Sequence, residues 1–190
     1  MAVSRIAKGW DRTLDGRGHS MNIELLRRST AEDHAAVEGA IPLMGTDLVL
    51  GQYVSVLRRM YGMVSAWERL CERDGPRWMQ PMLKERQRRA LLEEDLRVLG
   101  SELPGSELPN GGAPRLPEFA SDAEFLGAMY VMEGSRLGGL MIAKHVEGVL
   151  GLEAGRGDAY FRGGGDRRQR CGGRSLRFFE REFRTTRRRA

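Results

Sequence analysis

The chain has 190 residues, of which 41% are hydrophobic, and a formal net charge of +5. This length is enough for a sizeable core, so we expect one domain. The two cysteines form no metal-ligand or disulfide pattern, and no N-terminal segment resembles a signal peptide, which predicts a cytoplasmic protein. Twelve arginines against four carboxylates follow residue 155, so the positive charge belongs to the tail and the body gives no electrostatic case for nucleic acid.

The first helix is expected over residues 22–38, after a leader over 1–20 that lacks apolar periodicity and is expected to be disordered. A stripe at spacings of three and four includes His34, so we expect its imidazole to point inward. A lone inward histidine is more often a hydrogen-bonded core residue than a ligand, and both interpretations stay open. The stripe consists of Leu26, Thr30, His34, Val37 and Ile41.

Two further helices are expected over residues 48–73 and 82–99, the first ended by a Gly-Pro pair and the second charged on a solvated side. Residues 101–117 hold four of the seven prolines and are expected to form a loop. Beyond residue 151 we expect a turn-rich segment over 160–165 and a short helix over 175–183. No stretch alternates apolar and polar residues over a strand length, so the fold class is all-α.

A single long helix is expected over Phe125–Gly151, after a capping box formed by Ser121 and Glu124. It carries three glycines near its middle, and each costs roughly 1 kcal/mol relative to alanine. Small residues there either let another helix approach closely or let a flat ligand lie against a bare, kinked backbone. Both interpretations stay open, whereas interrupting charges exclude a membrane span. The glycines are Gly134, Gly138 and Gly139.

An inward histidine on a first helix and a bare glycine face on a later helix together describe a sandwich for a flat metallocycle. Histidine is a common proximal ligand of haem iron. His145 lies eleven residues from Gly134, about 16 Å along a helix, which is too far to serve iron beneath that glycine. We therefore expect His145 to be a structural or surface residue.

These segments match the pattern of a known family. The stretch LRRSTAEDHAAVE resembles the proximal-helix signature of the haem oxygenases, with a threonine four residues before the ligand histidine and a glutamate four after it. YVMEGSRLGGLMIAKH resembles the distal helix, and its EGSxLG form is similar to the bacterial branch, including the biliverdin-forming enzymes associated with bacteriophytochromes. The resemblance covers about residues 21–165. It implies a single-domain helical bundle with haem between a proximal helix and a kinked, glycine-bearing distal helix.

The resemblance also implies a role for each matching residue. His34 corresponds to the proximal iron ligand, and Glu38 to the acidic residue one turn on, a candidate partner for the other ring nitrogen or else a solvated side chain. Arg27 takes the place of the basic residue that pairs with a haem propionate, and Tyr130 that of the tyrosine that hydrogen-bonds one. The distal segment that covers the oxygen-binding side of the iron corresponds to Gly134, Ser135 and Gly138, with Gly139 beside them.

The implied reaction converts haem to biliverdin, Fe²⁺ and CO, with O₂ and with electrons from a ferredoxin or a flavoprotein reductase, and a bacteriophytochrome could accept the biliverdin. Backbone amides and a serine hydroxyl suit this reaction because they donate hydrogen bonds without a side-chain acid. The chain departs from the family over residues 166–190, an Arg-rich segment without the expected tryptophan. Two alternatives are a non-catalytic haem-binding or haem-transfer protein on the same fold, and a helical module whose tail contacts nucleic acid or anionic surfaces.

Overall fold

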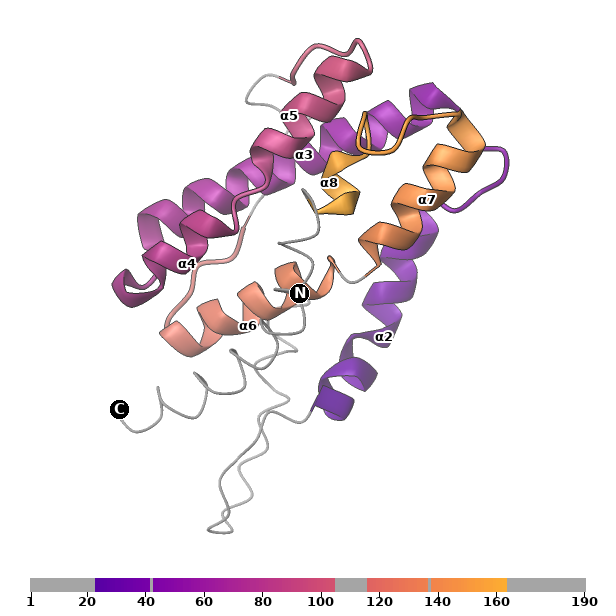
Figure 1. The fold of residues 1–190 in the computed structure, drawn as a ribbon. Coiled ribbons are helices and arrows are strands. Elements are labelled where there is room, and N and C mark those ends of the chain that lie inside the picture. Colours follow the sequence, from indigo (N-terminus) through magenta and orange to yellow (C-terminus); the bar gives the residue numbers. More distant parts are fainter. Residues whose placement is uncertain (1–22, 42, 105–115, 137, 164–190) are drawn as a thin grey trace. The chain divides into compact units, whose positions relative to one another are not determined.

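The computed structural model describes residues 23–41, 43–104, 116–136 and 138–163. These residues form helices and loops and contain no strand, which confirms the all-α class. None of their helices is both long and apolar enough to cross a membrane. The helices in chain order (Figure 1) are α2 (Ile23–Ala40), α3 (Leu50–Asp74), the 3-10 helix η1 (Arg77–Met79), α4 (Gln80–Glu85), α5 (Arg89–Val98), α6 (Asp122–Gly134), α7 (Gly139–Leu150) and α8 (Ala159–Arg162).

The described residues fall into two compact units. The first unit holds α2 and α6, and the second holds α3, η1, α4, α5, α7 and α8. The chain passes from one to the other between Ser135 and Arg136, within the glycine-bearing stretch. One haem oxygenase-like domain over residues 21–165 stays a prediction. The leader, the helix over 175–183 and the Arg-rich segment over 166–190 lie outside the described residues.

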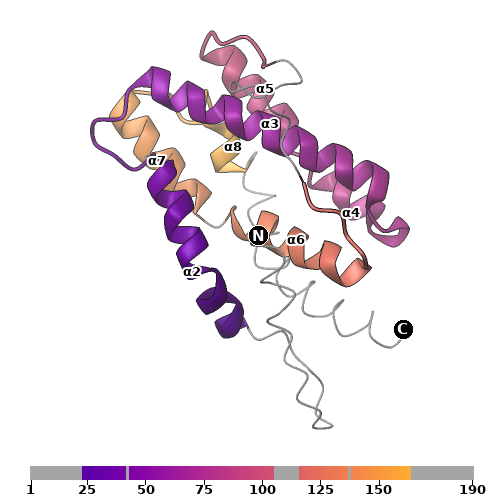
Figure 2. The ribbon, with the colours of Figure 1, turned by 180° about the vertical axis from the view of Figure 1, so that it is seen from behind.

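In the second unit, α5 lies along α3 in the antiparallel direction (Figures 1 and 2). Near one end the Arg58 guanidinium donates to the carbonyl of Glu102 at 2.6 Å, and further along the Tyr61 hydroxyl donates to Glu93 at 3.2 Å. Burying each large apolar side chain between the two helices contributes roughly 1.5–3 kcal/mol. The buried side chains of these two helices include Tyr53, Leu57, Val64, Leu92 and Leu96.

The expected helix over residues 82–99 is wrong as a single element, because it breaks between α4 and α5. The carboxylate of Glu68 on α3 accepts hydrogen bonds from the backbone N–H groups of Arg88, at 2.5 Å, and Arg89, at 3.0 Å. These are amides at the start of α5, where a helix has no partners of its own. A side chain twenty residues away therefore starts a new helix at this point.

The predicted helix ends and the proline-rich loop agree with the structure where it describes them. Helix α3 stops before Gly75, whose N–H donates to the carbonyl of Cys71 at 3.0 Å. Helix α7 stops before Gly151, whose φ of 67° is the left-handed conformation that favours glycine at a helix end. Residues 101–104, 116 and 117, the described part of the expected loop, are non-helical, as expected.

Candidate functional site

Helix α6 begins with the predicted cap, three residues earlier than the expected helix. The Ser121 hydroxyl accepts from the N–H of Glu124 at 3.3 Å, and the Glu124 carboxylate accepts from the N–H of Ala120 at 2.8 Å. The ring of Phe119 contacts that of Phe125 edge-on, with centroids 5.3 Å apart, and so secures the chain entering the helix. The cap places the start of the predicted distal segment within the first unit.

The expected single helix over Phe125–Gly151 is wrong, because α6 ends at Gly134 and α7 begins at Gly139. The Ser135 hydroxyl donates to the carbonyl of Met132 at 2.8 Å, a side-chain bond that competes with a continuous helix. Gly134 and Gly138, on either side of Ser135, further disfavour a helix here, because glycine loses more backbone entropy than other residues when it becomes helical. Together these local preferences end the helix, whereas the glycine pattern predicted a kink within one continuous helix.

The three glycines of this stretch do different things. A Cβ on Gly139 would overlap the carbonyl oxygen of Phe161, so this glycine allows α8 to pack against the start of α7. A Cβ on Gly134 or on Gly138 would meet no heavy atom within 4 Å among the described residues. Close packing therefore explains Gly139, while Gly134 and Gly138 present bare backbone.

Two polar residues of the predicted site lie on or next to α6. Ser135 is exposed, and its single hydroxyl proton is given to Met132. It can therefore accept a hydrogen bond as it stands, but it can donate to a ligand only after its O–H turns about the Cβ–Oγ bond away from Met132. Tyr130 is half-buried on α6. Gly134, Ser135 and Tyr130 all belong to the first unit, whereas Gly138 and Gly139 belong to the second.

The predicted inward orientation of His34 is wrong. Its side chain is 74% exposed, and Val37 on the same stripe is 57% exposed. Periodicity identifies which residues share a helix face, but whether that face is covered depends on the rest of the fold. Arg27 lies on α2, and its side chain is outside the described part of the structure.

The structure brings His34 and Glu38 together. Their side chains lie one turn apart on α2, with Nδ1 of the imidazole 3.3 Å from Oε1 of the carboxylate. This contact orients the ring and leaves Nε2 as the nitrogen available to a metal. The described residues contain no group of three or more metal-binding side chains, but a haem iron needs only one such ligand from the protein on its proximal side.

His145 is a structural residue, as expected. Its Nε2 lies 3.1 Å from the carbonyl oxygen of Gly45, in the loop between α2 and α3. Since a carbonyl only accepts, Nε2 carries the proton and donates. The bond ties α7 to the loop within the second unit.

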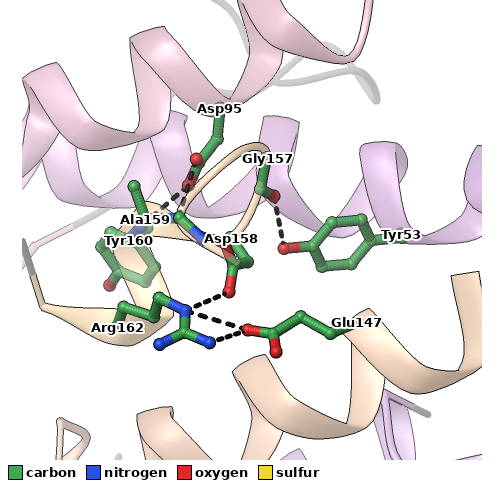
Figure 3. Close-up of polar contacts among 9 residues, drawn as sticks. Tyr53, Asp95, Glu147, Gly157, Asp158, Ala159, Tyr160 and Arg162 are labelled. Atoms are coloured by element: carbon green, nitrogen blue, oxygen red, sulfur yellow. Dashed lines mark hydrogen bonds and ion pairs between the residues drawn. The ribbon is translucent and has the colours of Figure 1, made fainter. Parts of the chain in front are cut away.

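A buried polar cluster around α8 was missed by sequence reasoning (Figure 3). Asp95 on α5 is fully buried, and its two carboxylate oxygens accept from the backbone N–H groups of Ala159 and Tyr160, each at 2.8 Å. Next to it, the Tyr53 hydroxyl donates to the carbonyl of Gly157 at 2.8 Å. The signal was present, because an aspartate between Leu92 and Leu96 on a buried stripe needs partners.

Ion pairs hold the C-terminal end of α8. The Arg162 guanidinium donates to Oδ2 of Asp158 at 2.8 Å and also pairs with Glu147 on α7 (Figure 3). Asp158 is fully buried, and its other oxygen accepts from the N–H of Gly155 at 2.7 Å. Burial raises the pKa of the Asp158 carboxyl, whereas hydrogen bonding lowers that of Glu147. The cluster therefore ties α8 to α7 through groups whose charges depend on one another.

Acidification should increase the stability that Asp95 provides. Burial raises its pKa to about 6, above the unfolded value of roughly 3.9. The folded state thus binds the proton more tightly, and the resulting stability is present below the unfolded pKa and lost as the pH rises through about 6. We compare the free energies of unfolding of the parent and of Asp95→Asn, measured with urea. The parent's advantage over the variant should be roughly 2 kcal/mol larger at pH 4 than at pH 7. Parallel pH profiles for the two proteins would contradict this.

Comparisons with family models, with curated proteins and with solved structures find no match to this chain.

Proposed function

We propose that the protein is a haem oxygenase, which opens haem to biliverdin, Fe²⁺ and CO with O₂ and external electrons. The observation that carries the proposal is the bare backbone at Gly134 and Gly138. A Cβ added at either glycine would meet no heavy atom within 4 Å among the described residues. A flat substrate lying against the backbone gives these glycines a purpose that helix packing does not.

The donor set of α2 fits haem. Nδ1 of His34 lies beside the Glu38 carboxylate, which leaves Nε2 as the nitrogen that would bind iron. When bound, haem would supply the iron centre that activates dioxygen. In this proposal Tyr130 and Arg27 hold the propionates, Arg27 through a charge-assisted bond.

The distal residues suit self-oxidation of the substrate because they offer hydrogen bonds without an acid. The Ser135 hydroxyl can orient an oxygen ligand, whereas the N–H groups of Ser135 and Gly139 already donate to the carbonyls of Val131 and Arg136. Ser135 would first exchange its bond to the Met132 carbonyl for one to the ligand. Gly139 keeps a supporting role, since it sets the packing of α7 rather than facing the substrate.

The deciding experiment is aerobic incubation of the ferric haem complex with ascorbate, in the presence of catalase to remove free hydrogen peroxide. We expect the Soret band to fall while biliverdin absorption grows, and an anaerobic sample to keep its Soret band. A complex that binds haem yet keeps this band in air would point to a haem carrier on the same fold. No haem binding would reject both functions.

In the cell the proposed enzyme would take electrons from a ferredoxin or a flavoprotein reductase, and its product could load a bacteriophytochrome. The proposal includes both partners and a cytoplasmic location. The electron donor can be tested by replacing ascorbate with each reductase system, because only a true donor, present at catalytic concentration, should reach the rate seen with ascorbate.

A further inference from the structure

Helix α8 depends on contacts to other helices, because it has only four residues and a single turn is not stable alone in water. Three sets of contacts hold it within the second unit. Asp95 binds its first two amides, Arg162 pairs with Asp158 and Glu147, and the rings of Tyr160 and Phe161 are buried. The position of α8 is thus set by α5 on one side and α7 on the other.

The contact between α8 and α7 reaches the glycine segment. The carbonyl oxygen of Phe161 would overlap a Cβ on Gly139, so the two backbones are in direct contact. Gly138 is the next residue back, and its carbonyl accepts from the N–H groups of Met141 and Ile142 at 3.1 and 3.2 Å. A shift of α8 would therefore displace the first turn of α7 and with it Gly138.

We propose that Asp95 is a positioning residue for the glycine segment: by capping α8 it fixes the start of α7 and hence the place of Gly138. This inference rests on the proposed function, in which Gly138 covers the substrate. Asp95 touches no substrate and acts through two backbone contacts, first to Ala159 and Tyr160 and then from Phe161 to Gly139.

The geometry makes Asp95 hard to replace. Both of its oxygens are occupied, at 2.8 Å each, and its side chain is fully buried. Alanine would leave two buried N–H groups without a partner, which the chain can relieve only by moving α8. Asparagine keeps one acceptor and turns an N–H group toward the second amide, so it should hold α8 partly.

The test compares Asp95→Ala and Asp95→Asn with Glu94→Ala, a neighbouring control whose side chain is 52% exposed and pairs with Arg97. Amide hydrogen exchange is measured on the protein without haem, over peptides covering residues 139–143 and 157–163. We expect exchange in both peptides to rise about tenfold in Asp95→Ala, less in Asp95→Asn and not at all in Glu94→Ala. Faster exchange in 157–163 alone would overturn the proposal, because α7 would then not follow α8.

The second readout uses haem. The ferric spectrum of Asp95→Ala should match the parent, since His34 is untouched, while the biliverdin yield falls about tenfold or the isomer ratio changes. The proposal would also be overturned if Asp95→Ala showed faster exchange in residues 139–143 but kept the biliverdin yield and isomer ratio of the parent. If Asp95→Ala does not fold, Asp95→Asn decides by the same criteria. A parent protein that binds no haem would defeat the proposed function, and the exchange data would still accept or reject the coupling of Asp95 to Gly138.

Discussion

In the proposed haem oxygenase, replacing His34 by alanine should remove the axial ligand, change the ferric haem spectrum and weaken haem binding by about tenfold or more. The two histidines among the described residues are His34 and His145, and the ring of His145 is bound to the carbonyl of Gly45. No described histidine is therefore free to replace His34. Haem titration followed at the Soret band, together with the ferric spectrum, measures both effects.

Two companion variants make the result specific. His145→Ala should lower thermal stability through loss of the bond to Gly45 and leave haem binding unchanged. Glu38→Gln should keep the ligand but weaken the control of its orientation, with a smaller loss of affinity. Added imidazole should restore the parent spectrum to His34→Ala. A His34→Ala protein with the parent spectrum and affinity would end the assignment of His34 as ligand.

The structural features that could be predicted from the sequence are those determined by residues close together in the chain. The cap at Ser121 and the ends of α3 and α7 depend on a few adjacent side chains and on glycine, so their patterns were sufficient. The all-α class followed from the missing alternation. The contact between His34 and Glu38 was also local, because residues four apart share a helix face.

The features that sequence missed depend on distant partners. Glu68 binds the first amides of α5 from another helix, and Asp95 holds a four-residue helix sixty-four residues further on. Neither partner can be identified from periodicity. The exposure of His34 likewise depends on what covers α2, and the different roles of Gly138 and Gly139 depend on whether α8 comes close.

Gly138 and Gly139 provide a matched pair that separates packing from substrate contact. Gly139→Ala should lower the free energy of unfolding by about 1–3 kcal/mol, because its Cβ would overlap the Phe161 carbonyl and backbone cannot yield as a side chain does. Gly138→Ala should change it by less than about 1 kcal/mol, since the space around Gly138 is open among the described residues. Urea unfolding of both variants measures the difference, and equal losses would mean that Gly138 is also a packing residue.

The larger substitution Gly138→Leu then tests the function. Its φ of −83° and ψ of −9° suit any residue, and a Cβ there would meet no described atom within 4 Å, so we expect the protein to stay folded and to bind haem through His34. Leucine would nevertheless crowd the backbone that is proposed to face the substrate, and we expect biliverdin formation with ascorbate to fall about tenfold or more. The Soret band should then persist under conditions in which the parent loses it. If Gly138→Leu is as stable as the parent and forms biliverdin at the parent rate, Gly138 does not face the substrate. The proposed function would then lose the observation on which it depends.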